Sequence, residues 1–339
     1  MINYADISSP YYLFASELDV VVFAANSTLS LSITDAGSSM VLSCSYTPVG
    51  GVVKVYDLDR LLSPLIAGVM ADFTFTVGGT SRTLHIIQSH ARVSESAADF
   101  LAGHFLSSVT SQRDTAVGRK ELVTLLSPSG SVNVVASCIY ADGETCVPQD
   151  VTLASSLASG VVHEVDCSPS LLVNAQLGVL VAYTVKAGAR TMSYRVSPTQ
   201  THRVAMLMRN SFGAWEPCYF RGMTEHDPKI TREMVLVGGR MRPLTIDEED
   251  TRKSYTGPLR PGGVQLHRDL ARSREVMLLE DGVTTDGVVI TDAELKHTDE
   301  DSHLPAFTCT WRRASRMSAM LDIPVVPRLF DDTFDDTFN

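Results

Sequence analysis

The chain has 339 residues and a formal net charge of −11, from 39 acidic and 28 basic side chains. Its length allows two or three domains of ordinary size. A surface of this sign repels phosphate backbones, so we expect no nucleic-acid partner. The sequence contains neither the roughly 20-residue apolar run of a membrane span nor the leader of a secreted protein, so we expect synthesis in the cytoplasm.

The first third of the chain alternates in the manner of β-strands. Gly78-Gly79 between two alternating segments predicts a hairpin. At Asp57 the spacing changes to that of a short helix, with Asp57 as its N-cap. Residues 1–112 therefore predict a β-sandwich. Its expected strands are residues 18–23, 29–33, 40–46, 52–56, 73–77 and 83–87.

A second sandwich is expected over residues 113–205. Residues 94–108 predict a short helix or a long connection, followed by a polar link at 111–114. Glycines then separate β-rich runs at the intervals typical of a sandwich. Its expected strands are residues 121–126, 131–140, 161–165, 179–186 and 191–196.

Residues 209–220 are the stretch around which we expect the chain to be organised. A strand at 204–208 ends in the polar turn Asn-Ser-Phe-Gly, and the next strand carries Trp215, Tyr219 and Phe220. Asn and Gly tolerate the left-handed backbone of such turns, and aromatic residues favour half-buried strands. The stretch contains no nucleophile–base pair and no phosphate-binding loop.

The region 206–322 predicts an α+β domain with mainly antiparallel pairing. A hairpin is expected around Gly238-Gly239 and an amphipathic helix over 264–274. Its expected strands are residues 230–237, 240–246, 275–279, 288–291 and 307–311. The predicted fold class is therefore mainly β: tandem β-sandwich-like domains, a C-terminal α+β domain and an extended tail.

The tail, residues 323–339, begins with Ile-Pro-Val-Val-Pro and ends in a repeated Asp-Asp-Thr-Phe. Phe330, Phe334 and Phe338 are four residues apart, which places three rings on one side of a helix. Such a peptide cannot bury itself alone and is suited to a groove on a neighbour. The alternative is a solvated terminus.

Two acidic clusters are candidate cation sites. The first cluster is His297-Thr298-Asp299-Glu300-Asp301-Ser302-His303, which has neither the spacing of a calcium-binding loop nor that of a His-Glu-x-x-His zinc motif. The second cluster, residues 247–250, is Asp-Glu-Glu-Asp. We interpret both as solvated loops.

Three histidines, His85, His90 and His104, could meet as a metal site, but their spacing favours structural roles. No Gly-x-Ser-x-Gly or Gly-x-Gly-x-x-Gly motif occurs in a catalytic or nucleotide-binding context. We therefore predict no enzyme activity and no catalytic, cofactor-binding or metal-binding residues.

The six cysteines form no Cys-x-x-Cys pair and are expected to be reduced, with a Cys138–Cys146 hairpin bridge as the alternative. Arg312, Arg313 and Arg316 flank Trp311; in an acidic protein we expect such arginines to pair with acidic neighbours or a partner subunit.

Six segments together carry a resemblance to a known group of proteins: residues 44–48, 53–62, 209–213, 254–259, 290–296 and 304–312. They resemble proteins encoded in phage and prophage tail modules of gut Bacteroidales. The resemblance covers about half of the chain and implies a virion tail or tail-tip component without catalytic residues. It also implies a subunit that is made in the host cytoplasm and assembles with itself and other tail proteins.

Two functions follow as hypotheses. The first is a structural subunit of a phage tail, ring or baseplate, with residues 323–339 contacting another chain and Phe330, Phe334, Phe338 and Trp215 as interaction residues. The alternative is a non-catalytic β-sandwich that binds carbohydrate or a host surface. Trp215, Tyr219 and Trp311 are then candidate aromatic platforms, although core packing is the simpler role for each.

Overall fold

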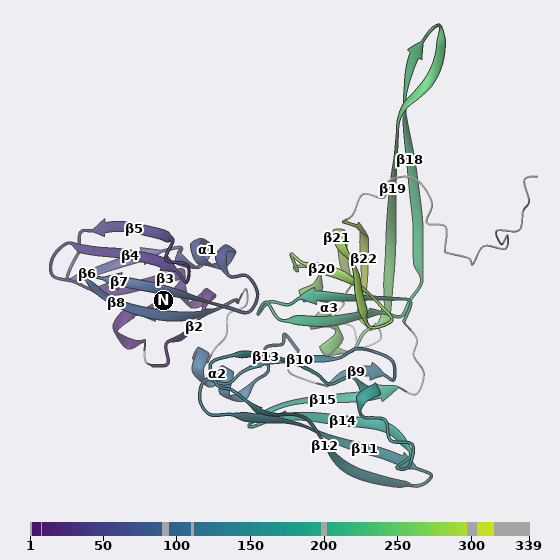
Figure 1. Cartoon of the computed structure of the whole chain (residues 1–339), viewed down its shortest axis with the longest axis horizontal. Helices are drawn as coiled ribbons and strands as arrows, with labels where there is room; N and C mark the ends of the chain where they lie inside the picture. The colour runs from purple at the N-terminus through teal and green to yellow at the C-terminus, as the bar shows by residue number, and fades with distance from the viewer. Residues whose placement is uncertain are drawn as a thin grey trace, which may run out of the picture.

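The structure is a computed structural model that describes residues 2–7, 9–89, 95–109, 112–197, 202–296 and 304–314, apart from the side chains of residues 247 and 261. The described chain is mainly β, with sheets of three, five, two, five and seven strands and mostly antiparallel pairing, which confirms the expected fold class. Figure 1 shows three groups of sheets and one hairpin that projects from them.

Two sheets built from residues 2–87 enclose the first core. A five-stranded sheet has the order β2-β8-β7-β4-β5 and a three-stranded sheet the order β1-β3-β6. Alternate residues of both sheets point inward, so one apolar cluster fills the space between them. The strands are β1 (Ile2–Asn3), β2 (Tyr12–Phe14), β3 (Val20–Ala24), β4 (Leu29–Asp35), β5 (Met40–Tyr46), β6 (Val52–Tyr56), β7 (Met70–Val77) and β8 (Thr80–Ile87).

Helix α1 (Leu58–Leu62) packs Leu58 and Leu62 against this core. The prediction of Asp57 as a capping residue is right in position and wrong in mechanism. Asp57 has a left-handed backbone (φ 59°), and its side chain makes no capping hydrogen bond. Its carboxylate instead lies 3.5 Å from Arg60 Nε.

The second group of sheets uses residues 113–197. A five-stranded sheet, β12-β11-β14-β15-β9, packs over the pair β10-β13, with a buried core between them. The expected strands do not include β9 or the long β12. β12 contains Pro148, Gln149 and Asp150, which it tolerates because it is an edge strand. The strands are β9 (Arg113–Ala116), β10 (Leu122–Leu126), β11 (Val132–Asp142), β12 (Thr145–Leu157), β13 (Val162–Asp166), β14 (Val179–Ala187) and β15 (Arg190–Ser197).

The third group is a seven-stranded sheet of order β17-β16-β20-β21-β22-β19-β18. Helix α3 (Pro261–Leu270) places Leu266 and Leu270 against its core, where Trp311 is fully buried. The strands are β16 (Val204–Arg209), β17 (Trp215–Phe220), β18 (Thr224–Val237), β19 (Arg240–Pro258), β20 (Val276–Glu280), β21 (Val283–Lys296) and β22 (Ala306–Arg313).

The prediction that residues 247–250 form a loop is wrong. All four residues belong to β19, where they pair with β18; Glu249, for example, lies opposite Lys229. Charged residues are compatible with a strand here because Glu248 and Glu249 are exposed, and the half-buried Asp250 forms an ion pair with Arg252.

The turn between β16 and β17 joins the three groups. Phe212 packs on Phe14 of β2 and on Phe100 of helix α2 (Ala97–Gly103), with ring centroids 5.9 and 5.3 Å away. Gly213 has φ +73°, and a Cβ there would lie 2.0 Å from the Gly68 carbonyl oxygen. The stretch expected to organise the chain is thus a buried junction and not a surface turn.

Short 3-10 helices complete the connections: η1 (Tyr4–Asp6), η2 (Ala15–Asp19), η3 (Ser63–Leu65) and η4 (Pro169–Leu171). Among the described residues no helix is both long and apolar enough to cross a membrane.

Candidate functional site

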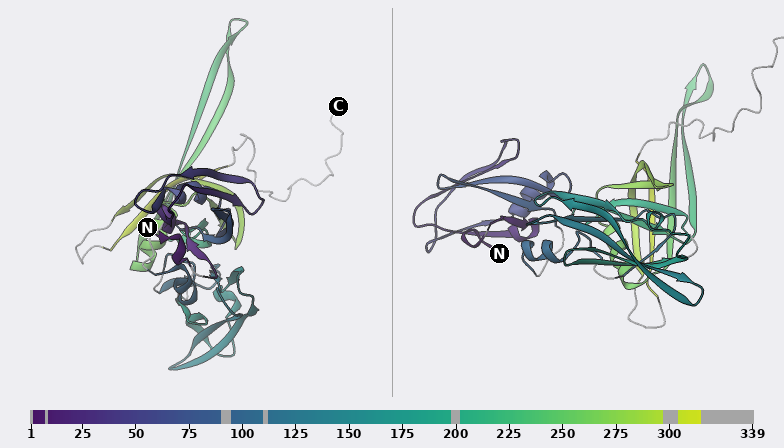
Figure 2. Two further views of the ribbon diagram at one scale, coloured as in Figure 1. Left: turned by 90° about the vertical axis from the view of Figure 1, so that its left-hand side faces the viewer. Right: turned by 60° about the horizontal axis from the view of Figure 1, so that its bottom comes forward.

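The hairpin β18–β19 projects from the seven-stranded sheet as an arm, which we define as residues 227–251. Its paired residues extend from Asp227–Thr251 to Val237–Arg240, whereas the pairing of β19 with β22 begins only at Arg252. Beyond that point the arm is a two-stranded ribbon. Figures 1 and 2 show it standing clear of the other sheets from three directions.

Exposed apolar side chains distinguish the arm from an ordinary solvated hairpin. Leu236 and Leu244 are 65% and 66% exposed. A two-stranded ribbon alone is marginally stable in water, and apolar side chains gathered on an exposed element mark interaction surfaces. The arm is therefore the strongest candidate assembly surface. Its exposed apolar residues are Ile230, Met234, Leu236, Val237, Met241, Leu244 and Ile246.

A buried polar network ties the junction to the second group of sheets. Asn210 Nδ2 donates to Glu216 Oε2 at 2.9 Å, and Ser107 Oγ donates to Glu216 Oε1 at 2.5 Å. Arg113 forms an ion pair with Glu216 and lies 3.9 Å from Glu121. Because all five side chains are nearly inaccessible to solvent, removal of one partner would leave a buried charge uncompensated.

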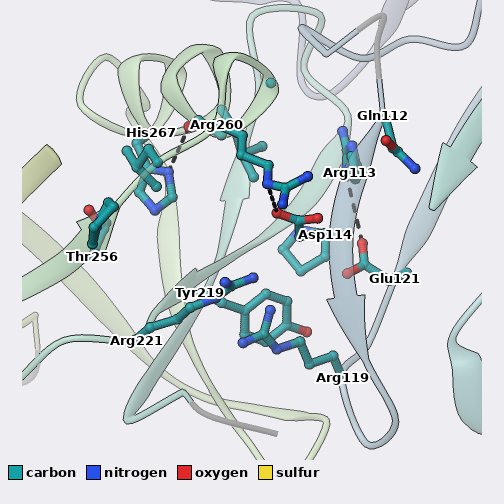
Figure 3. A pocket seen from close by; sticks show the side chains of 16 residues that line it. Gln112, Arg113, Asp114, Arg119, Glu121, Tyr219, Arg221, Thr256, Arg260 and His267 are labelled. Carbon is teal, nitrogen blue, oxygen red and sulfur yellow. Dashed lines mark hydrogen bonds and ion pairs between the residues drawn. The ribbon is translucent and has the colours of Figure 1, made fainter. Parts of the chain in front are cut away.

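A basic pocket lies beside this network, between the β9–β10 connection, β17 and the start of α3 (Figure 3). Its cavity volume is about 70 Å³. Arg119 lies over the Tyr219 ring at 4.5 Å, and Arg260 Nε is 3.3 Å from Asp114. Arg221 completes the basic side of the pocket, which Pro258, Leu259 and Leu266 close with apolar surface. 

Burial shifts the pKa of two groups that line this pocket. It raises the pKa of Glu121 to about 7, an effect that Arg113 and Arg119 partly offset. It lowers the pKa of His267 to about 4. In the neutral ring, His267 Nδ1 donates to the Gly263 carbonyl oxygen at 2.8 Å. 

The predicted aromatic platforms have different surroundings. Trp311 is a core residue, and its indole nitrogen donates to Ser254 Oγ at 2.9 Å. Tyr219 is half-buried and donates to the Lys120 carbonyl oxygen. Trp215 is also half-buried. The Arg209 guanidinium carbon lies 4.1 Å from the centroid of the Trp215 ring, and Trp215 borders a surface hollow of about 310 Å³.

Other predicted interaction residues, Phe330, Phe334 and Phe338, lie outside the described residues, as do His90, Arg316 and the 297–303 cluster. Arg312 Nη1 lies 2.6 Å from Glu249, and Arg313 lies 3.6 Å from Glu280, so the expected acidic pairing of these two arginines is confirmed.

The two described histidines of this candidate set have different acidic partners. His85 Nδ1 is 2.7 Å from Asp72, whereas His104 Nε2 is 3.7 Å from Glu95. Elsewhere, Asp19, Asp57 and Asp59 bring carboxylate oxygens within 4.8 Å of one another. The first two are exposed, and three oxygens fall short of the 6–8 that calcium takes, so this cluster carries no assignment.

All six cysteines are free, so the alternative Cys138–Cys146 bridge is wrong. In the hairpin β11–β12 Cys146 lies opposite Ala141 and Cys138 opposite Gln149. Cys138 points into the core, whereas Cys146 is exposed.

Sequence reasoning missed the arm and the basic pocket. For the arm, the sequence signal is the pair of alternating segments around Gly238-Gly239, which predicts only a shorter hairpin, residues 230–246. For the pocket no local signal exists, because Arg119, Arg221 and His267 are far apart in sequence. Comparison with known protein families and with curated proteins finds no match to this chain.

Proposed function

We propose that this protein is a structural subunit of a phage tail, of tail-tip, baseplate or ring type. It assembles with copies of itself and with other tail proteins, and belongs to the virion after synthesis in the host cytoplasm. The observation that carries the assembly function is the arm, an exposed two-stranded ribbon with apolar side chains. The resemblance of several segments to tail-module proteins supports the setting.

The arm is suited to a second copy of the chain or a neighbouring tail protein because apolar burial is the main favourable term in association. Its outer edges also present unpaired backbone groups that can extend a neighbour's sheet. A ring needs two different surfaces on each subunit, and a projecting arm supplies one of them.

The test compares the full chain with a variant whose arm is shortened. Replacing residues 230–248 by Asn-Gly joins Lys229 and Glu249, which face each other in the hairpin, through a type I′ turn. Light scattering after size exclusion should give a discrete oligomer for the full chain and a monomer for the shortened variant. Unchanged circular dichroism would show that the sheets remain folded.

The matched control is Leu171→Ser, which changes an apolar residue of similar exposure, 57%, outside the arm. Its oligomer should have the mass of the parent. A monomeric full chain, or a shortened variant with the parent mass, contradicts the proposal.

The alternative function, carbohydrate binding, has one specific observation in its favour: Trp215 borders the surface hollow of about 310 Å³, beside Glu164. That volume is near the lower end of the roughly 300–1,000 Å³ typical of ligand sites. Glycan-array binding by the full chain that Trp215→Ala abolishes, with the fold intact, would favour this function. A full chain that binds no glycan rejects it.

A further inference from the structure

The Arg119 guanidinium is a buried cation that stacks on the Tyr219 ring and is attracted by the carboxylates of Glu121 and Asp114 only at longer range. Arg119 is only 3% exposed, and its Nε is enclosed without a hydrogen-bond acceptor. Among the described residues, no carboxylate or carbonyl forms an ion pair or hydrogen bond with this guanidinium; it is stacked on Tyr219. A buried arginine of this kind is costly unless an anion completes its environment.

A second guanidinium lies close to the first. Figure 3 shows Arg119 and Arg221 beside the ring of Tyr219. Burial and, second to it, the positive charge of Arg221 lower the pKa of Arg119, an effect that the carboxylates of Glu121 and Asp114 partly offset. Two like charges at one pocket repel each other, and a bound carboxylate would relieve both the repulsion and the missing hydrogen bonds.

The start of α3 adds to the positive potential. Helix α3 has ten residues, and its N-cap, Arg260, makes no capping hydrogen bond. Gly262 and Gly263 of its first turn line the pocket, so the positive end of the helix dipole faces the same space. Asp114 forms an ion pair with Arg260, and Glu121 lies 3.9 Å from Arg113; both carboxylates also attract Arg119, but neither forms a hydrogen bond or an ion pair with it.

The size of the pocket restricts its ligand. A cavity of about 70 Å³ accepts one carboxylate-sized group and not a sugar or a nucleotide. The rest of the ligand must lie outside, along the apolar rim formed by Pro258, Leu259 and Leu266. The complementary ligand is therefore a peptide that alternates acidic and apolar side chains.

We propose that the basic pocket binds an aspartate of residues 330–338, supplied by a neighbouring copy of the chain. This segment has four aspartates, three phenylalanines and no basic residue. Fifteen residues, 315–329, separate it from Ala314, enough for a reach of about 50 Å when extended. The carboxylate accepts hydrogen bonds from the guanidinium groups of Arg119 and Arg221, and a phenylalanine contacts the apolar rim.

The inference extends the proposed assembly function, but its test does not depend on the arm. The receptor is the full chain with Asp331, Asp332, Asp335 and Asp336 changed to Asn, so that its own segment no longer competes. The probe is a fluorescent synthetic peptide of residues 328–339. Fluorescence anisotropy should show saturable binding that weakens as salt is added.

Arg221→Gln in this receptor should weaken peptide binding about tenfold or more, as expected when one charge-assisted contact is lost. Because Arg221 is exposed, its replacement leaves the fold intact, whereas Arg119→Gln is a second variant that needs a folding check. Arg195→Gln, at an exposed arginine of β15 outside the pocket, is the matched control and should bind as the parent.

Three results would overturn the inference: no peptide binding, equal binding by the Arg221→Gln receptor, or equal binding of a peptide whose aspartates are replaced by asparagine. Inorganic phosphate serves as a further probe. If phosphate protects the folded protein in an Arg221-dependent manner while the peptide does not bind, the pocket takes a free oxyanion and the proposed occupant is wrong. Failure of the arm experiment alone leaves this result unaffected.

Discussion

Two consecutive hairpins of the same sheet have opposite environments. In β16–β17 the turn at 210–214 is mostly buried, and its Phe212 and Ala214 share an apolar cluster with Phe14 of the first group and Leu126 of the second, whereas the arm formed by β18 and β19 projects into solvent. Both turns contain glycine with a left-handed backbone, at Gly213 and Gly239. The comparison teaches that turn chemistry defines a hairpin but not its place in the molecule, which depends on what surrounds it.

The largest expected effect separates these two glycines. Gly213→Ala should destabilise the protein by about 3 kcal/mol or more, because it combines a strained φ with a collision against the Gly68 carbonyl oxygen. Gly239→Ala has a similar φ of +76° and open space around the new Cβ, so it should cost only about 1 kcal/mol. Urea unfolding of both variants measures the difference, and equal losses would show that the junction is not tightly packed.

A smaller effect concerns the ionisable groups near the buried hairpin. The raised pKa of Glu121 gives stability that is present below about pH 4.5 and is lost as pH rises through about 7. The lowered pKa of His267 gives stability that is present above about pH 6.5 and is lost as pH falls through about 4. Between pH 4.5 and 6.5 the contributions of Glu121 and His267 to the free energy of unfolding therefore change with pH in opposite directions.

Single variants should reveal these slopes as difference curves against the parent. Relative to the parent, Glu121→Gln should gain about 2–3 kcal/mol of unfolding free energy as pH rises from 4.5 to 7. His267→Gln should lose a similar amount as pH rises from 4 to 6.5. Urea unfolding at half-unit pH intervals measures both, and flat difference curves would contradict the assigned shifts.

The smallest effect on stability is expected in the arm. Leu236→Ser together with Leu244→Ser should change the free energy of unfolding of the dissociated chain by less than about 0.5 kcal/mol, because both side chains are exposed. The same change should weaken self-association, measured by light scattering over a dilution series. A large loss of stability without a change in association would show that the arm packs on its own chain.

Much of the secondary structure follows from local sequence. Alternating apolar residues predict β3, β7 and β8 with their starts two or three residues off, and Gly78-Gly79 predicts the turn of the β7–β8 hairpin. The failures are equally instructive. The acidic residues 247–250 and the Pro148-Gln149-Asp150 part of β12 have the composition of loops but lie on strands, where pairing with a neighbouring strand defines the structure.

The sequence by itself determined a mainly β protein, the turn at 210–213 and the pairing of Arg312 and Arg313 with acidic groups. Only the tertiary structure decided that this turn is the buried junction, that residues 227–251 stand alone as an arm, and that Arg119 and Arg221 share a pocket with His267. The physical reason is the distance along the sequence over which each feature is determined. Hairpins and strands depend on neighbouring residues, whereas burial and pockets depend on contacts between residues a hundred or more positions apart.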